Sequence, residues 1–163
     1  MRRLIAAALA SVSFAAAFGM LAVGAWAQTA TVDHLTAADI LAKAQELQPK
    51  AQKGGSASVK LMDYPNHYTM VALRNKSGGA ELHQNFADFF YIVRGKATLL
   101  TGGTIQDQTT SGPGEFKGSA VKGGTTTELN EGDVVHIPAG VSHQMVLPEG
   151  GELVYFVIKV KEQ

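Results

Sequence analysis

The stretch GDVVHIPAGVSHQ, residues 132–144, places a short apolar segment between two tight turns. Gly132 can open this segment, because glycine adopts the positive φ angles that sharp turns need. Pro138 and Gly140 can close it, since proline fixes φ and offers no N–H group to a neighbouring strand. His143 is then the second or third residue of the next predicted strand, where the rigid turn restrains it. Such restraint suits a metal ligand or a general base, although the spacing alone also suits an ordinary hydrogen-bonded histidine.

An alternation of apolar and polar residues extends this β pattern over most of the chain, from Val59 onward. The segments with this period of two are SVKLM, HYTMVAL, AELHQ, DFFYIV, KATLLT, TTTEL, DVVHI, HQMVL and ELVYFVIKV. Many short strands between turn residues predict an all-β sandwich or barrel. Residues 102–124 interrupt the rhythm. Their glycine, serine and threonine content predicts a long loop, either a lid over a pocket or a surface excursion.

A single helix is predicted before the strands, over LTAADILAKAQELQP, residues 35–49. Thr36 can cap its start, with Asp39 three residues later as in a capping box. An apolar stripe at helical spacing follows, made of Ile40, Leu41, Ala44 and Leu47. Pro49 marks the predicted end of the helix, and the KGGSAS segment after it is a predicted loop.

The N-terminal residues have the pattern of a secretory signal peptide. Arg2 and Arg3 precede a long apolar run that ends in the sequence AWA. We expect cleavage after Ala27, which would place the mature protein in the periplasm or outside the cell. The alternative is an uncleaved anchor, because the apolar run of residues 4–26 is long enough to span a bilayer.

Three parts are therefore predicted along the chain. Residues 1–27 are the signal peptide, residues 28–55 are a lead-in with the N-terminal helix, and residues 56–163 are the β-barrel domain. The third part is long enough to bury a core of its own.

The amino-acid composition limits the kinds of partner that the chain can bind. The chain has 163 residues with 14 basic and 14 acidic side chains, and it has no cysteine. Because Arg2 and Arg3 are the only charged residues of the predicted signal, the mature chain has two more acidic than basic groups. This balance argues against a nucleic-acid partner. No basic amphipathic stretch predicts stable membrane association after signal cleavage, and without cysteine no disulfide or thiol chemistry is available.

The spacing in residues 132–144 resembles the second motif of the cupin superfamily. That motif is glycine, five residues, proline, one residue, glycine, two residues and histidine. Gly132, Pro138, Gly140 and His143 match it without substitution. The family's usual asparagine four residues after the histidine is absent, since Leu147 stands there.

The segment AELHQNFADFFYIVRG, residues 80–95, resembles the first cupin motif when it is aligned from its end. Gly95 takes the terminal glycine, and Asp88 takes the position of the motif's glutamate. His83 takes the second histidine, and Glu81 falls on the first. The resemblance covers roughly Val59 to Val160 and differs from the family pattern at two of the three ligand positions of this motif.

What the resemblance implies is a cupin-type double-stranded β-helix, or jelly-roll barrel, with one short N-terminal helix. It also implies a divalent metal ion inside the barrel. Residue by residue, the implied ligands are Glu81, His83, Asp88 and His143. Two carboxylates with two imidazoles form a harder donor set than the family's usual three histidines, so iron, manganese, zinc or nickel is expected rather than copper.

Strand parity is consistent with this ligand set. Glu81 and His83 are two residues apart, so they share one face of a strand. The same parity places four apolar side chains inside the barrel as a predicted ligand pocket, namely Phe90, Ile92, Met145 and Leu147. It also leaves an outer apolar stripe, made of Phe89, Tyr91 and Val93, which the N-terminal helix or a second subunit could cover.

Two classes of function follow from these residues. The first is an exported metal-dependent oxygenase, isomerase or lyase that acts on a small molecule, with open metal positions for substrate or water. The alternative is a non-catalytic barrel that binds or senses a metal or a ligand. A third, weaker interpretation is a scaffold that has lost the metal. The sequence assigns no catalytic residue, and it predicts a small-molecule ligand and a homodimer through an exposed sheet face.

Overall fold

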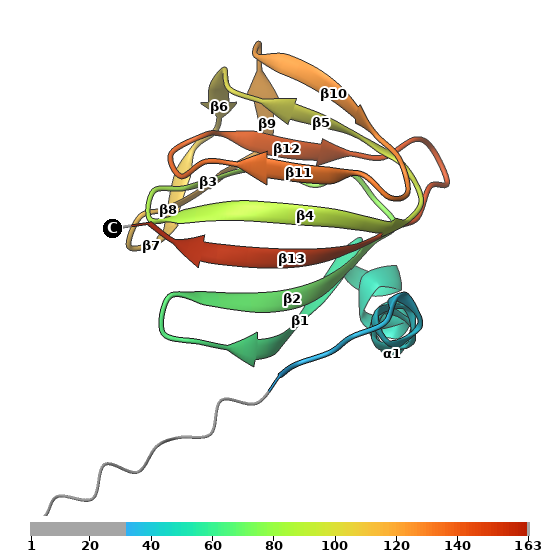
Figure 1. Ribbon diagram of the computed structural model, residues 1–163. Helices are drawn as coiled ribbons and strands as arrows, with labels where there is room; N and C mark the ends of the chain where they lie inside the picture. Colours follow the sequence, from blue (N-terminus) through green and yellow to red (C-terminus); the bar gives the residue numbers. More distant parts are fainter. Residues whose placement is uncertain (1–31, 163) are drawn as a thin grey trace, which may run out of the picture. The chain divides into compact units, whose positions relative to one another are not determined.

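A computed structural model describes residues 32–162 of the chain. The predicted signal peptide, residues 1–27, lies outside the described residues. Within the described part, one helix and thirteen strands follow one another along the chain (Figure 1). This confirms the predicted all-β class with a single N-terminal helix.

Two antiparallel sheets form the barrel. The five-stranded sheet has the order β1 (Ser56–Asp63), β2 (His67–Arg74), β13 (Leu153–Lys161), β4 (Phe86–Arg94) and β11 (Val134–Ile137). The six-stranded sheet has the order β10 (Thr125–Leu129), β5 (Ala97–Thr101), β12 (His143–Val146), β3 (Ala80–His83), β8 (Glu115–Gly118) and β7 (Thr109–Gly112). A separate pair consists of β6 (Thr104–Gln106) and β9 (Ala120–Lys122).

The main core lies between the two larger sheets. Ile92 of β4, Leu99 of β5 and Leu153 of β13 are almost completely buried there. Burying a side chain of this size stabilises the fold by about 1.5–3 kcal/mol. Each of the nine predicted strand segments contributes one strand, which places the alternating apolar residues on the inner faces of the sheets.

Residues 102–124 differ from the predicted loop, because they contain the four short strands β6 to β9. Ile105 of β6 lies opposite Val121 of β9, and both pack against Ala80 on the outer side of β3. The strand β8 pairs with β3 and extends the six-stranded sheet. The segment therefore has its own small core and helps to build the barrel wall.

The helix α1 (Ala37–Gly54) begins as predicted and ends later. Thr36 and Asp39 form the capping box, with Asp39 N–H donating to Thr36 Oγ1 at 3.2 Å. The predicted end at Pro49 is wrong, because Ala51 is completely buried one half-turn later. Gly55 then ends the helix with φ 84° and donates its N–H to Ala51 O, a conformation that favours glycine.

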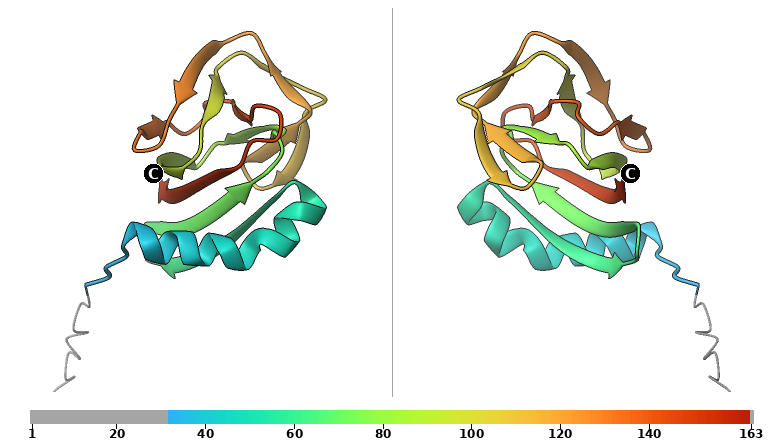
Figure 2. Two further views of the ribbon diagram at one scale, coloured as in Figure 1. Left: turned by 90° about the vertical axis from the view of Figure 1, so that its right-hand side faces the viewer. Right: turned by 90° about the vertical axis from the view of Figure 1, so that its left-hand side faces the viewer.

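The helix packs across the outer face of the five-stranded sheet at β1 and β2 (Figure 2). Ile40 and Ala44 face the sheet, and Val93 of the predicted outer stripe is buried with them. Tyr91 remains 40% exposed and Val134 69% exposed, so the helix covers only part of the apolar face. A homodimer through the remainder stays a prediction.

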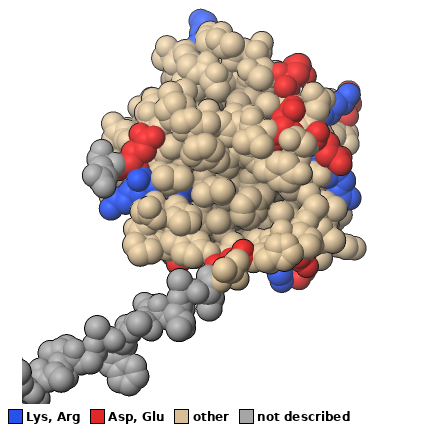
Figure 3. Space-filling model, viewed as in Figure 1, with Lys and Arg blue, Asp and Glu red and all other residues tan. Residues whose placement is uncertain are grey.

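Charged side chains on the face of Figure 3 lie mostly around its edge, and neither sign forms a continuous patch there. Among residues 32–162, no helical segment combines the length and the apolar character that crossing a membrane requires.

Candidate metal site

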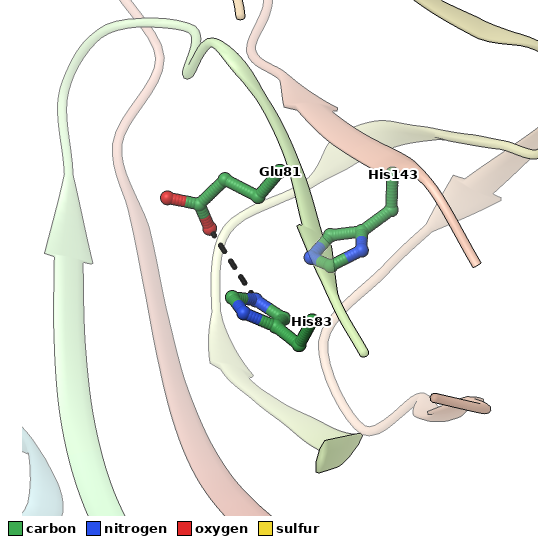
Figure 4. A group of neighbouring side chains, drawn as sticks. All are labelled: Glu81, His83 and His143. Atoms are coloured by element: carbon green, nitrogen blue, oxygen red, sulfur yellow. Dashed lines mark ion pairs between the residues drawn. The ribbon is translucent and has the colours of Figure 1, made fainter. Parts of the chain in front are cut away.

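Three of the predicted ligands come from neighbouring strands of the six-stranded sheet. Glu81 and His83 lie two residues apart on β3, and His143 of β12 pairs directly with Glu81. The three side chains point toward one another (Figure 4). One ligand atom from each lies within 4.8 Å of the other two, which is close enough for a small local movement to bring all three onto one ion.

Asp88, the fourth predicted ligand, reaches the same place from β4 in the other sheet. Its Oδ2 atom lies 3.5 Å from His83 Nε2 and 3.6 Å from His143 Nε2. Donor atoms that bind one ion at about 2.1 Å are themselves about 3–3.5 Å apart, so this spacing fits a shared metal. The other oxygen of Asp88 lies 2.6 Å from Lys159 Nζ. The structure thus brings all four predicted residues together.

Both imidazole rings are held in the orientation that a metal ligand needs. His83 Nδ1 donates to Glu115 Oε2, and His143 Nδ1 donates to the carbonyl of Val141 at 3.1 Å. In each ring this leaves Nε2 as the acceptor atom, and both Nε2 atoms face Asp88. His83 Nε2 is buried without a hydrogen-bond partner among the described residues. A carboxylate on the far nitrogen is a frequent support for a metal-binding histidine.

Electrostatics favour the protonation states that bind a cation. Burial is the main cause that lowers the pKa of His143, so this imidazole is neutral near pH 7. Burial alone would raise the pKa of Glu81, but His143, His83 and two nearby cations outweigh it and hold the pKa below its usual value. A neutral imidazole and an ionised carboxylate are the ligand forms of these residues. The residues present therefore fit a divalent metal.

One carboxylate and one ammonium group beside the site come from β8, in the segment that was predicted to be a loop. Glu115 pairs directly with His83 in the β3–β8 register, and Lys117 pairs with Glu81. Lys117 Nζ lies 3.7 Å from Glu81 Oε1. Neither residue was predicted from the sequence, because no strand was predicted in this segment.

Lys159 was also missed, although the sequence held a signal for it. It follows Tyr155 and Val157 at a period of two on β13, and that face of the strand points into the barrel. A lysine at an inward position predicts a carboxylate partner, since an unpaired buried charge is costly.

A cavity of about 400 Å³ opens beside the four residues. Its apolar wall includes Phe90, one of the four residues of the predicted ligand pocket, together with Met70 and Val157. The other three residues of the predicted ligand pocket, Ile92, Met145 and Leu147, lie in the core between the sheets and do not line this cavity. Their contact with a ligand stays a prediction.

Polar side chains line the rest of the cavity. They include the phenols Tyr68 and Tyr155 and the cations Lys50, Arg74, Lys117 and Lys159. Burial is the main cause that raises the pKa of both phenols, so both remain protonated at neutral pH. The cavity thus combines an apolar wall with converging polar groups, as small-molecule sites do.

The comparisons with known proteins give matches in structure only. No protein-family model and no curated protein matches the sequence. A double-stranded β-helix protein from Klebsiella pneumoniae has a TM-score of 0.50 and 13% identity, over 66% of this chain and 78% of that chain. The match to the Cnp3 cupin domain of Schizosaccharomyces pombe has a TM-score of 0.49 and 11% identity, over 66% and 61%.

A third match is the DMSP lyase DddQ of Ruegeria pomeroyi, with a TM-score of 0.49 and 15% identity over 66% of this chain and 47% of that chain. This chain therefore spans less than two thirds of the length of the lyase and of the Cnp3 domain. At these identities the likeness concerns the fold, and the chemistry must be argued from the residues themselves.

Proposed function

Because the chain has the double-stranded β-helix fold of the cupins, we propose that it binds a divalent metal ion inside the barrel and a small molecule in the cavity beside it. One observation carries this proposal. Two histidines and two carboxylates from three strands converge at the cavity, with both Nε2 atoms left as acceptors.

The donor set indicates the kind of metal. Glu81, His83 and His143, with Asp88 nearby, offer nitrogen and oxygen ligands and no sulfur, which suits zinc, iron, manganese or nickel. When bound, such an ion supplies Lewis-acid polarisation of a ligand oxygen.

The chain's own residues can bind, orient and protonate a ligand. Tyr68 lines the cavity, and its raised pKa keeps its hydroxyl available as a hydrogen-bond donor. Lys159 holds Asp88 in place from the opposite side. Met70 and Phe90 form an apolar part of the cavity wall. Groups that hold protons beside a polarised oxygen favour isomerisation or a lyase reaction.

An oxygenase is the second candidate, and a specific observation favours it. Glu81, His83 and His143 together are two histidines and one carboxylate, the set found in many non-haem iron oxygenases. A barrel that binds metal and ligand without turnover is the non-catalytic alternative.

Metal content tests the shared part of these candidates. Purified protein is supplied in turn with zinc, manganese, iron(II) and nickel, dialysed, and measured by elemental analysis. We expect about one ion per chain, and loss of that ion in His83→Ala and in His143→Ala. His136→Ala is the matched control, because this exposed histidine stacks on Phe89 outside the barrel. Unchanged metal content in both ligand variants would refute the site.

Turnover then separates the classes. Each metal-loaded form is incubated with a panel of small oxygenated compounds, with and without dioxygen. An isomerase or a lyase is active without dioxygen, whereas an oxygenase consumes it. Metal binding without any conversion supports the non-catalytic barrel.

Export is proposed separately, on the pattern of residues 1–27. Expression of the full chain in a bacterium, followed by cell fractionation and N-terminal sequencing, tests it. We expect a mature protein that begins at Gln28 in the periplasm or the medium. A membrane-bound product with its N-terminus intact would favour the anchor.

A further inference from the structure

Arg74, at the end of β2, is a cation in the cavity wall without a carboxylate partner. Within the described residues, its side chain donates one hydrogen bond, from Nε to the Tyr155 hydroxyl at 3.0 Å. Within residues 32–162, no carboxylate forms an ion pair with its guanidinium. The four N–H groups on its terminal nitrogens have no hydrogen-bond partner in this part of the chain. A partly buried guanidinium with four unused donors is well placed to receive a ligand.

This guanidinium has neighbours on two sides. Tyr155 holds Nε, and the backbone of Gly78 lies against the terminal nitrogens. A Cβ atom at Gly78 would lie 2.6 Å from Arg74 Nη1, so a larger residue there would require the end of the Arg74 side chain to move. Gly78 has no positive φ that would otherwise require glycine. The guanidinium thus occupies the space that a side chain at position 78 would enter.

Arg74 also lies where two cavities meet. The main cavity and a second one of about 310 Å³ share Ser56, Arg74, Glu81 and Lys117 in their walls. A ligand held by Arg74 thus lies next to Glu81, one of the proposed metal ligands. Arg74 contributes to the lowered pKa of Glu81, which is consistent with this proximity.

The charges around the main cavity favour an anion. Its wall contains four cations and three carboxylates, namely Lys50, Arg74, Lys117, Lys159, Glu81, Asp88 and Glu115. Lys159 pairs with Asp88, Lys117 pairs with Glu81, and Glu115 contacts His83. Arg74 and Lys50 remain without a carboxylate in the described part of the chain, and a divalent metal would add further positive charge.

We propose that Arg74 binds the carboxylate of a small organic acid in this cavity. The planar guanidinium matches a carboxylate with two parallel hydrogen bonds, which a lysine cannot form. Phosphate fits less well, because two N–H groups of the glycine-rich wall are already used within the chain. The N–H of Gly78 donates to Met145 O at 2.8 Å and that of Gly55 donates to Ala51 O. The inference rests on the proposed function only in placing the ligand beside the metal site.

Binding of defined probes tests the proposal. Calorimetric titrations use both zinc-loaded and chelator-treated protein. The probes are five organic acids, namely pyruvate, lactate, malonate, succinate and benzoate. The primary amide of each acid and inorganic phosphate are titrated in the same way for comparison. We expect at least one acid to bind and its amide to bind far more weakly. Arg74→Gln weakens this binding about ten- to hundredfold, since charge-assisted hydrogen bonds are lost. Arg74→Lys has an intermediate effect because it keeps the charge and loses the planar fork.

Three controls make the outcome decisive. Arg94→Gln removes an exposed arginine at the end of β4 that does not line the main cavity, and it leaves binding unchanged. Gly78→Ala keeps every charge but requires the end of the Arg74 side chain to move, so it weakens binding less than Arg74→Gln does. Circular dichroism and metal content of each variant show that the fold and the metal site persist.

Failure of this inference differs from failure of the metal site. Protein that keeps its metal but binds no acid of the panel, or binds it equally after Arg74→Gln, overturns the role of Arg74 alone. Arg74-dependent binding of phosphate as tight as that of every acid overturns the carboxylate. Protein that binds no metal refutes the proposed function, while titration of the chelator-treated form still tests Arg74.

Discussion

Lys159 of β13 lies opposite Asp88 of β4, and its Nζ atom is 2.6 Å from Asp88 Oδ1. Both atoms are buried, and neither has a hydrogen-bond partner among the described residues. The contact is therefore an ion pair without hydrogen-bond geometry. The second oxygen of Asp88 faces the Nε2 atoms of His83 and His143. One carboxylate therefore lies between a permanent cation of the chain and the place proposed for a metal.

Replacement of Lys159 by methionine separates these two roles of Asp88. Without metal, the variant leaves a buried carboxylate without its cation, and we expect a loss of about 3 kcal/mol in the free energy of unfolding. Metal affinity rises in the same variant, because Asp88 no longer shares its charge. Urea unfolding of the chelator-treated protein and competition with a chromogenic chelator measure the two effects. Lys161→Met, two residues further along β13 and exposed, is the control that changes neither. Equal stability of Lys159→Met and wild type would contradict the ion pair.

Substitution of Glu115 by glutamine tests whether this carboxylate supports His83. The amide can still accept from His83 Nδ1, but it no longer stabilises positive charge on the ring. We expect metal affinity to fall about ten- to hundredfold with little change in the melting temperature. Glu128→Gln is the matched control, because Glu128 lies on an exposed part of β10 and accepts a hydrogen bond from the Thr98 hydroxyl. An unchanged affinity in Glu115→Gln would show that the contact with His83 has no effect on the metal.

Much of the fold could be predicted because its signals are local. The period of two located nine strands, and Thr36 with Asp39 located the start of the helix. The shared face of Glu81 and His83 also follows from parity. These features depend on residues that are close together in the sequence.

The rest depends on contacts between distant segments. The strands β6 to β9 are three or four residues long and mostly polar, so they show little alternation, and only pairing with β3 and with one another makes them strands. Glu115 was missed for that reason. The ion pair of Asp88 with Lys159 needs the β4–β13 register, which no local pattern supplies. The predicted helix end at Pro49 failed because burial of Ala51 outweighs the lost helical hydrogen bond.

The continuation of α1 through Pro49 gives a stability prediction. Proline in a helix interior removes one hydrogen bond and crowds the preceding turn, and Pro49 is exposed, so no packing depends on it. We expect Pro49→Ala to raise the free energy of unfolding by about 1–3 kcal/mol, as measured by urea unfolding. Pro65→Ala, in the turn between β1 and β2, is the control and should give no such gain. A neutral or destabilising Pro49→Ala would contradict the expected cost of proline at this position.

The capping box of α1 predicts a dependence of stability on pH. Hydrogen bonds from the side chain and the backbone of Thr36 lower the pKa of Asp39, so the folded protein favours the ionised carboxylate more than the unfolded chain does. This stabilisation is fully present above the aspartate pKa of the unfolded chain, about 4, and is lost as the pH falls through the lower value of the folded state.

Thr36→Ala removes both hydroxyl contacts of the box and should lower the melting temperature by a few degrees at pH 7. The difference from wild type should shrink as the pH falls below about 4 and through the lower pKa of Asp39 in the folded protein, where the carboxylate becomes protonated and its bonds from Thr36 weaken. Thermal unfolding followed by circular dichroism at pH 3 to 7 measures this, with the exposed Thr126→Ala of β10 as control. A difference that stays constant over the whole pH range would mean that Thr36 stabilises the helix without the Asp39 carboxylate.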